Sequence, residues 1–168
     1  MGNADEAILV LTTGGTIDKV YFDALSEFQV GTSAVPRLFE IARVRRRFRI
    51  EEATRKDSLE LTDEDRAAIR ARIVAASEQM VVVTHGTDTM TATAQALSAV
   101  EGKVIVLVGA LAPARFQESD AAFNLGMAFA TAQVAQPGVY ITMNGTVFDG
   151  LKVVKDRGAE AFVDSSSS

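Results

Sequence analysis

The segment that most constrains the fold of this chain is Val81–Asp88, where an apolar run leads directly into a polar glycine turn. Three consecutive β-branched residues, Val81–Val83, are typical of a short strand that is buried on both faces of a parallel sheet. A helix is predicted from about Met90, with Asp88 or Thr89 as its cap. Hydroxyls and a carboxylate therefore lie between the end of a strand and the start of a helix, which is where open α/β sheets bind ligands.

A second turn of the same kind occurs near the N-terminus. The apolar run Ala7–Thr12 predicts a strand, and it leads into Thr13-Gly14-Gly15-Thr16. Glycines at this point allow positive φ angles or a close approach of the backbone to a ligand. The turn has neither the lysine of a phosphate-binding loop nor the GxGxxG spacing, so it gives little support to a nucleotide site. Threonine and aspartate are also ordinary turn residues, but two such turns are harder to explain in that way than one.

Strands and helices alternate along the rest of the chain. Further strands are predicted at residues 48–53, 103–108 and 138–143, and helices at 32–44, 62–74, 90–100 and 118–134. Residues 17–31 have no clear period, and we expect a loop over the site that acts as a lid. Residues 146–148 and 151–155 are expected to form a hairpin around Asp149-Gly150. This order predicts one α/β domain over residues 1–168, a three-layer αβα fold with a mostly parallel, flavodoxin- or Rossmann-like sheet and a C-terminal hairpin.

The composition argues against several classes of function. A net charge of −5 gives no overall attraction to nucleic acid or to an anionic membrane. Five arginines between positions 43 and 49 form a local basic cluster, which we interpret as a solvated helix end instead of a nucleic-acid patch. With no cysteine and one histidine, neither a metal site nor a cofactor is predicted. No signal peptide or apolar run of membrane-spanning length is visible, which predicts a cytoplasmic protein with no membrane partner.

If the strands are parallel, the polar turns that follow them meet at one edge of the sheet. The residues that this brings together are Thr13, Ser58, Thr87, Asp88, Ala110 and Asn144. They include hydroxyls and a carboxylate, but no metal-ligand set and no Ser-His-Asp order. His85 lies beside them in the sequence, and we expect it to be a buried, hydrogen-bonded neutral imidazole instead of the base that activates a threonine.

The two turns resemble the two signature motifs of the bacterial-type L-asparaginase/glutaminase family. The matching segments are Thr12-Thr13-Gly14-Gly15-Thr16-Ile17 and Thr84-His85-Gly86-Thr87-Asp88-Thr89, about seventy residues apart. The similarity extends to Lys56-Asp57-Ser58, to Val108-Gly109-Ala110, and to residues 144–155, which carry the family lysine. Together and in this order the two motifs are highly specific.

The resemblance implies a role for each matching residue. Thr13 would be the nucleophile that forms an acyl-enzyme ester, with Tyr21 hydrogen-bonded to it. Thr87, Asp88 and Lys155 would form a second hydroxyl–carboxylate–amine group, in which the lysine acts as a base if it is neutral and otherwise organises a proton relay. Ser58 would bind the α-carboxylate of the substrate, and Asp88 would bind its α-ammonium. The backbone N–H of Thr87 would stabilise the oxyanion, with Gly14 nearby, and the Ala110 carbonyl would accept a hydrogen bond from the leaving nitrogen.

The implied reaction is hydrolysis of L-asparagine to L-aspartate and ammonia, with glutamine as a poorer substrate. Two alternatives stay open: a non-catalytic domain that senses asparagine or aspartate, and an amidotransferase subunit that needs a partner chain. The full hydroxyl–amine set favours the enzyme, because a sensor would not need it. Familiar members of the family also have a C-terminal domain that closes the pocket of a neighbouring subunit. This sequence resembles a short-chain form without that domain, so we expect weaker substrate binding unless a homo-oligomer supplies the missing wall.

Overall fold

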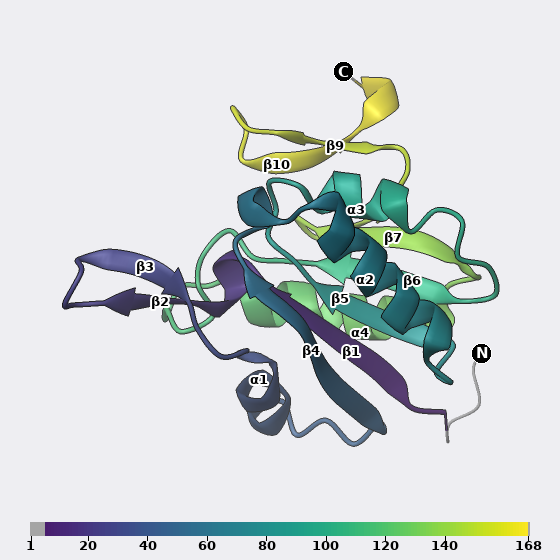
Figure 1. Ribbon diagram of the computed structural model, residues 1–168, viewed down its shortest axis with the longest axis horizontal. Helices are drawn as coiled ribbons and strands as arrows, with labels where there is room; N and C mark the ends of the chain where they lie inside the picture. The colour runs from purple at the N-terminus through teal and green to yellow at the C-terminus, as the bar shows by residue number, and fades with distance from the viewer. Residues whose placement is uncertain (1–5, 168) are drawn as a thin grey trace.

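The computed structural model describes residues 6–167, and its centre is a six-stranded sheet in the order β4-β1-β5-β6-β7-β8 (Figure 1). The first five of these strands are parallel to one another, and only β8 is antiparallel to its neighbour. Numbered along the chain, the parallel strands follow the 2-1-3-4-5 order of flavodoxin-like sheets. The strands span β1 Ile8–Gly14, β4 Phe48–Lys56, β5 Met80–Thr84, β6 Val104–Val108, β7 Gly138–Met143 and β8 Thr146–Asp149.

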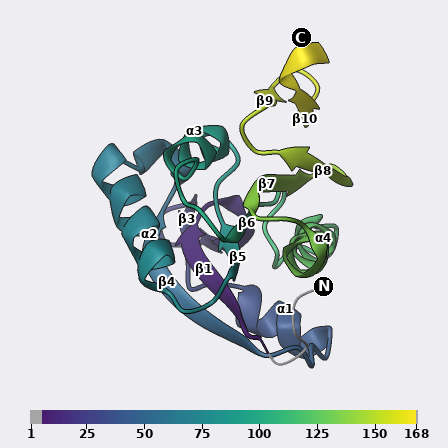
Figure 2. The same ribbon diagram turned by 90° about the vertical axis from the view of Figure 1, so that its right-hand side faces the viewer.

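Helices cover both faces of this sheet, which confirms the three-layer αβα prediction (Figure 2). Ile69 of α2 and Met90 of α3 pack with Leu9 on one face, and Phe39 of α1 and Leu125 of α4 pack with strand residues on the other. All seven residues of β1 and all five of β5 and of β6 are buried, as expected for strands with helices above and below. The helices are α1 Val35–Ile41, α2 Asp63–Ala75, α3 Met90–Ala96 and α4 Ala121–Val134.

The segment 17–31 was expected to be a loop, and it forms an antiparallel hairpin instead. A short 3₁₀ helix, η1 Thr16–Asp18, is followed by β2 Lys19–Phe22, which pairs with β3 Glu27–Val30. The hairpin projects from the side of the sheet (Figure 1). Its aromatic side chains are largely exposed, so the hairpin has no continuous buried face, and this explains why no strand pattern is visible in its sequence.

The C-terminal hairpin is present, but its strands differ from those expected from the sequence. Asn144 and Gly145 have φ angles of 52° and 71°, and this two-residue turn pairs β8 with β7. The strand β9 Val153–Asp156 does not pair with residues 146–148, and it pairs with β10 Ala161–Asp164. The Asn-Gly turn therefore determines the pairing, and Asp149-Gly150 only connects the two sheets.

The β9–β10 hairpin lies across the edge of the main sheet and is anchored there by apolar and polar contacts. Val153 and Phe162 pack into the core on the α2–α3 face. The Phe162 backbone N–H donates to the side chain of Asn144 at 2.9 Å. These contacts fix the position of Lys155, which points from β9 towards the carboxyl ends of the parallel strands.

Of the five arginines between positions 43 and 49, Arg49 at the start of β4 is paired with acidic side chains, and the interpretation of the cluster as a solvated helix end stays a prediction. Arg49 forms ion pairs with Glu51 at 2.6 Å and with Glu78 at 2.8 Å. Among residues 6–167, no helix is both long enough and apolar enough to cross a membrane. The cytoplasmic location stays a prediction from the sequence.

Candidate active site

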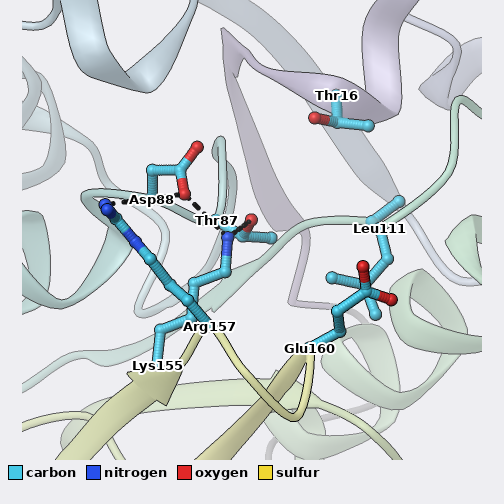
Figure 3. Close-up of a pocket in the computed structure, with 8 residues that line it drawn as sticks. Thr16, Thr87, Asp88, Leu111, Lys155, Arg157 and Glu160 are labelled. Carbon is cyan, nitrogen blue, oxygen red and sulfur yellow. Dashed lines mark hydrogen bonds and ion pairs between the residues drawn. The ribbon is translucent and has the colours of Figure 1, made fainter.

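A pocket of about 250 Å³ opens where the turns after β1, β5 and β6 meet the β9–β10 hairpin (Figure 3). Its walls carry two hydroxyls, two carboxylates and two cationic side chains, and little apolar surface. The residues that line it are Thr16, Thr87, Asp88, Ala110, Leu111, Lys155, Arg157 and Glu160. The predicted meeting of polar turns at one edge of the sheet therefore produces a polar cavity suited to a small charged ligand.

Thr87, Asp88 and Lys155 form one hydrogen-bonded cluster on the wall of this pocket. The Lys155 ammonium donates to the Thr87 hydroxyl at 2.7 Å and to the Asp88 carboxylate at 2.8 Å. The Lys155 side chain is only 16% exposed, so both contacts are shielded from bulk water. The amine comes from β9 and the other two groups from the turn after β5, some seventy residues earlier, so the fold itself assembles the cluster.

The turn after β5 leaves Asp88 free for this contact because it does not cap the next helix. Thr89 is the N-cap of α3, and its side chain makes no capping hydrogen bond. The Thr89 hydroxyl donates instead to the Ser58 carbonyl at 2.7 Å, which ties the turn to η2 Ser58–Glu60. The expected capping by Asp88 or Thr89 is therefore wrong in detail, and the carboxylate points into the pocket.

Glycines bring the turns of β1 and β5 into direct backbone contact. Gly15 has a φ of 90°, and a Cβ there would lie 2.4 Å from the Gly86 nitrogen. A Cβ on Gly86 would in turn lie 2.6 Å from the Cβ of Ser58. Larger residues cannot fit at either position without moving backbone, so the glycines fix the distance between the two motifs.

Thr13 does not reach the pocket in the structure, and Thr16 does. Thr13 is fully buried, and its hydroxyl donates to the Thr84 carbonyl at 2.7 Å. The strand β1 continues to Gly14, two residues beyond the predicted end, so Thr13 is a strand residue and not a turn residue. The chain turns only at Gly14 and Gly15, which carries the Thr16 side chain to the pocket wall (Figure 3).

Three other predicted site residues lie outside the pocket lining. Tyr21 is 52% exposed on the β2–β3 hairpin, where its ring packs edge-to-face on that of Phe28 with 5.3 Å between the ring centroids. Gly14 lies against β4, since a Cβ there would be 2.5 Å from the Lys56 carbonyl oxygen. Ser58 is buried next to Gly86. Its hydroxyl has no hydrogen-bond partner among the described residues, so it is still available to donate a hydrogen bond to a ligand.

His85 is the buried neutral imidazole that the sequence predicts. Its Nδ1 donates to the Gly86 carbonyl at 2.7 Å, and its Nε2 lies 2.7 Å from the Thr93 hydroxyl. Burial, with a smaller contribution from the nearby Arg66, lowers the pKa of His85 from 6.5 to about 4, against the raising effect of the Gly86 hydrogen bond. These two hydrogen bonds hold the turn after β5, and His85 is not among the residues that line the pocket.

Asp18 is a second buried titratable group, at the end of the turn after β1. Its side chain accepts from the Ala34 backbone N–H at 2.8 Å, and its carbonyl accepts from Gly31 N–H at 2.8 Å. Burial raises the pKa of Asp18 from 3.8 to about 6, against the lowering effect of the Ala34 hydrogen bond. Both contacts close the base of the β2–β3 hairpin.

Four lining residues were missed in the sequence: Thr16, Leu111, Arg157 and Glu160. Thr16 had a local signal, because it is the first hydroxyl after the two glycines that turn the chain. Leu111 follows directly on Ala110, which was identified. Arg157 and Glu160 lie in the turn between β9 and β10, and their position depends on a strand pairing that has no local signature.

The chain is similar in sequence to known proteins. Residues 7–165 match the family model described as "Asparaginase, N-terminal". The chain is 35% identical to L-asparaginase 2 of Escherichia coli (strain K12) over 163 residues, which covers 88% of this chain and 46% of that protein. It is also 35% identical to a glutamyl-tRNA(Gln) amidotransferase subunit of Methanococcus vannielii over 150 residues, 84% of this chain and 35% of that protein.

A solved structure agrees with these matches. L-asparaginase I of Vibrio cholerae superposes with a TM-score of 0.83 at 29% identity, over 96% of this chain and 52% of that one. The chain thus spans between a third and a half of the length of the two curated relatives. Because the family model covers nearly all of the described residues, this chain belongs to the asparaginase family, in the part that forms the N-terminal domain.

Proposed function

We propose that this protein is an amidohydrolase that converts L-asparagine to L-aspartate and ammonia, with weaker activity on glutamine. The observation that carries the proposal is the Lys155–Thr87–Asp88 cluster, which faces a second hydroxyl, that of Thr16, across a small polar pocket (Figure 3). Glutamine has one more methylene than asparagine, and a single methylene changes binding by ~1–3 kcal/mol. We therefore expect glutamine to be the poorer substrate.

In the proposed reaction Thr16, and not Thr13, is the nucleophile. Thr13 Oγ1 is buried and already donates to a carbonyl, whereas Thr16 is half-buried on the pocket wall. The Thr16 oxygen adds to the side-chain amide carbon, its proton passes to the amide nitrogen, and the C–N bond breaks to release ammonia. Water then adds to the resulting ester, and L-aspartate leaves as the threonine hydroxyl is restored.

The Thr87–Asp88–Lys155 cluster handles the proton in this scheme. Lys155 is paired with Asp88 at 2.8 Å as an ammonium, and an ammonium has no lone pair with which to take a proton from a hydroxyl. It holds the Thr87 hydroxyl in a fixed orientation, from which that hydroxyl relays a proton between Thr16 or water and the leaving nitrogen. Of the two roles that the sequence left open for the lysine, the geometry favours the relay.

The remaining polar groups are proposed to hold the substrate. The Asp88 carboxylate uses Oδ1 for Lys155 and keeps Oδ2 for the α-ammonium. Ser58, with its unpartnered hydroxyl, is proposed to bind the α-carboxylate once the ligand is present. The Thr87 backbone N–H is proposed to stabilise the oxyanion, and the Ala110 carbonyl to accept from the leaving nitrogen. No step in this scheme requires a cofactor.

Self-association is also part of the proposal. The Asp88 side chain is 35% exposed, and one side of the pocket is open to solvent. A second copy of the chain that covers this side would exclude water and strengthen the charged contacts within it. The match to an amidotransferase subunit favours a second candidate, a protein that supplies ammonia to a partner chain.

The decisive experiment measures ammonia release from L-asparagine by wild type, Thr16→Ala and Thr13→Ala. We expect Thr16→Ala to reduce kcat by ~10³-fold or more while its free energy of unfolding stays within ~1 kcal/mol of wild type. Thr13→Ala removes a buried hydrogen bond, so we expect a loss of stability of about 1–2 kcal/mol with kcat within threefold of wild type.

Mass spectrometry of the quenched reaction should detect the acyl-enzyme on the peptide that contains Thr16. An acyl group on Thr13 or Thr87, or full activity of Thr16→Ala, would reject the assignment. Binding of L-aspartate by a wild-type protein that releases no ammonia would favour the sensor. Ammonia release that appears only with a partner protein would favour the amidotransferase subunit.

A further inference from the structure

The turn between β9 and β10 places a second cation beside the Lys155–Asp88 pair. Arg157 Nη2 lies 3.9 Å from Asp88 Oδ1, the oxygen that also accepts from Lys155 at 2.8 Å. In Figure 3 the Arg157 side chain crosses that of Lys155 in this view, and its guanidinium ends next to Asp88. Its side chain is 73% exposed, against 16% for Lys155. Lys155 is therefore held in the cluster, whereas Arg157 is held only by a long contact.

We propose that Arg157 binds the α-carboxylate of the substrate while Asp88 holds its α-ammonium, so that this pair makes the pocket specific for free α-amino acids. The proposal rests on the proposed function, because it concerns the same pocket. It adds a specificity-determining residue that the signature motifs do not contain. The substrate carboxylate would then be bound by a cation as well as by the neutral hydroxyl of Ser58.

The arrangement of charge supports this assignment. An α-amino acid carries its ammonium and its carboxylate on the same carbon, so its complement is an acid and a base side by side, as Asp88 and Arg157 are. A contact of 3.9 Å is longer than a hydrogen bond, so the guanidinium can move to a ligand without breaking one. A guanidinium also offers two parallel N–H groups to a carboxylate.

The shape of the turn and a second acid fix the orientation of the ligand. Asp156 accepts hydrogen bonds from the backbone N–H groups of Gly158 at 2.9 Å and Ala159 at 3.1 Å, which holds the backbone on either side of Arg157. Glu160 ends the turn in the left-handed region, with a φ of 49°, and its carboxylate lies on the opposite side of the pocket (Figure 3). A ligand carboxylate is repelled from Glu160 and attracted to Arg157.

Binding of L-aspartate and of β-alanine tests this proposal, because β-alanine is L-aspartate without the α-carboxylate. Both ligands are measured by calorimetry on wild type, Arg157→Gln, Arg157→Lys and Lys152→Gln. Lys152 is a matched control, since its side chain is also 73% exposed and its partner is Asp149, outside the pocket. We expect Arg157→Gln to weaken L-aspartate binding about tenfold or more and β-alanine binding less than twofold.

Arg157→Lys should recover part of the loss, and Lys152→Gln should bind both ligands within twofold of wild type. In turnover of L-asparagine, Arg157→Gln should raise KM about tenfold and leave kcat within threefold. An unchanged affinity of Arg157→Gln for L-aspartate, or an equal loss for both ligands, would overturn the proposal. If the wild-type protein binds L-aspartate but releases no ammonia, only the proposed hydrolase function is rejected. If it binds neither L-aspartate nor β-alanine, both that function and the proposed role of Arg157 are rejected.

Discussion

The turns that follow β1 and β5 supply the same pocket, but they are stabilised in different ways. The turn after β5 is held by side chains: Lys155 bonds to Thr87 and Asp88, and His85 bonds to the backbone beneath them. The turn after β1 is held by backbone, since Gly15 fits against Gly86 with no room for a Cβ. One turn therefore carries a charged network, and the other presents a single hydroxyl, that of Thr16, to the same pocket.

This difference predicts that the turn after β1 is the less tolerant of an added methyl group. Gly15→Ala would place a Cβ 2.4 Å from the Gly86 nitrogen in a backbone conformation with φ at 90°. The overlap and the φ strain together should destabilise the protein by about 4 kcal/mol, and we expect no measurable turnover. The free energy of urea unfolding measures the effect.

Gly102→Ala is the matched control for that substitution. Gly102 also has a positive φ, 71°, but a Cβ there would meet nothing within 4 Å. Its cost should be limited to about 1 kcal/mol for the left-handed conformation, with normal turnover. Equal losses of stability at the two glycines would show that the contact between the turns does not matter.

The turn after β5 should respond to the loss of a charge. Lys155→Met leaves Asp88 without its closest cation and frees the Thr87 hydroxyl, so we expect kcat for L-asparagine to fall by about 10²-fold or more. Lys152→Met provides the comparison, because Lys152 pairs with Asp149 at 3.3 Å on the surface, and it should leave kcat unchanged. A Lys155→Met enzyme with kcat within threefold of wild type would remove the cluster from the mechanism.

The contrast between the two turns also explains which parts of the site could be predicted. Thr87, Asp88 and Lys155 were identified because each side chain is recognisable in its motif, and the structure brings all three together. Thr13 was assigned as the nucleophile from the resemblance, and the sequence does not show that β1 continues past it. The strand is buried on both faces, so no alternation of polar and apolar residues marks its last residue.

The fold was predictable for a related reason, and the strand pairing within the two hairpins was not. The order of buried strands and amphipathic helices implies the parallel sheet and its covering helices. The β2–β3 and β9–β10 pairings connect segments with little or no buried apolar pattern, so the sequence alone places neither Tyr21 nor Arg157. Tyr21, which the resemblance placed at the site, lies on the exposed hairpin, and Arg157, for which no role was predicted, lines the pocket.

Each turn contains one buried titratable group, and the two groups act on stability in opposite directions. Asp18 has a pKa raised from 3.8 to about 6, so the stability it contributes is present below pH 3.8 and is lost as the pH rises through 6. His85 has a pKa lowered from 6.5 to about 4, so its contribution is present above pH 6.5 and is lost as the pH falls through 4. Between pH 4 and 6 the two effects oppose each other.

Asp18→Asn separates these two effects. The variant keeps an acceptor for the Ala34 N–H but does not ionise, so its stability relative to wild type should increase by about 2 kcal/mol between pH 4 and pH 7. At each pH the wild-type free energy of unfolding is subtracted from that of the variant, which cancels the contributions of all other groups. The new amide adds an offset that does not depend on pH, so it leaves the change of this difference between pH 4 and pH 7 unaffected. A difference that stays constant from pH 4 to pH 7 would show that Asp18 titrates normally in the folded protein.

The smallest effect is expected at Ser58, which lies where the two turns meet. Its buried hydroxyl has no partner among residues 6–167, so Ser58→Ala should leave stability unchanged or raise it by up to about 1 kcal/mol. Thr142 on β7 has an equally buried, unpartnered hydroxyl away from the pocket, and Thr142→Val should change stability in the same direction. Only Ser58→Ala should weaken L-aspartate binding, by about fivefold, because only the Ser58 hydroxyl is proposed to bind the α-carboxylate of the ligand. Equal L-aspartate affinities in the two variants would mean that the Ser58 hydroxyl is a packing feature of the turn contact and takes no part in recognition.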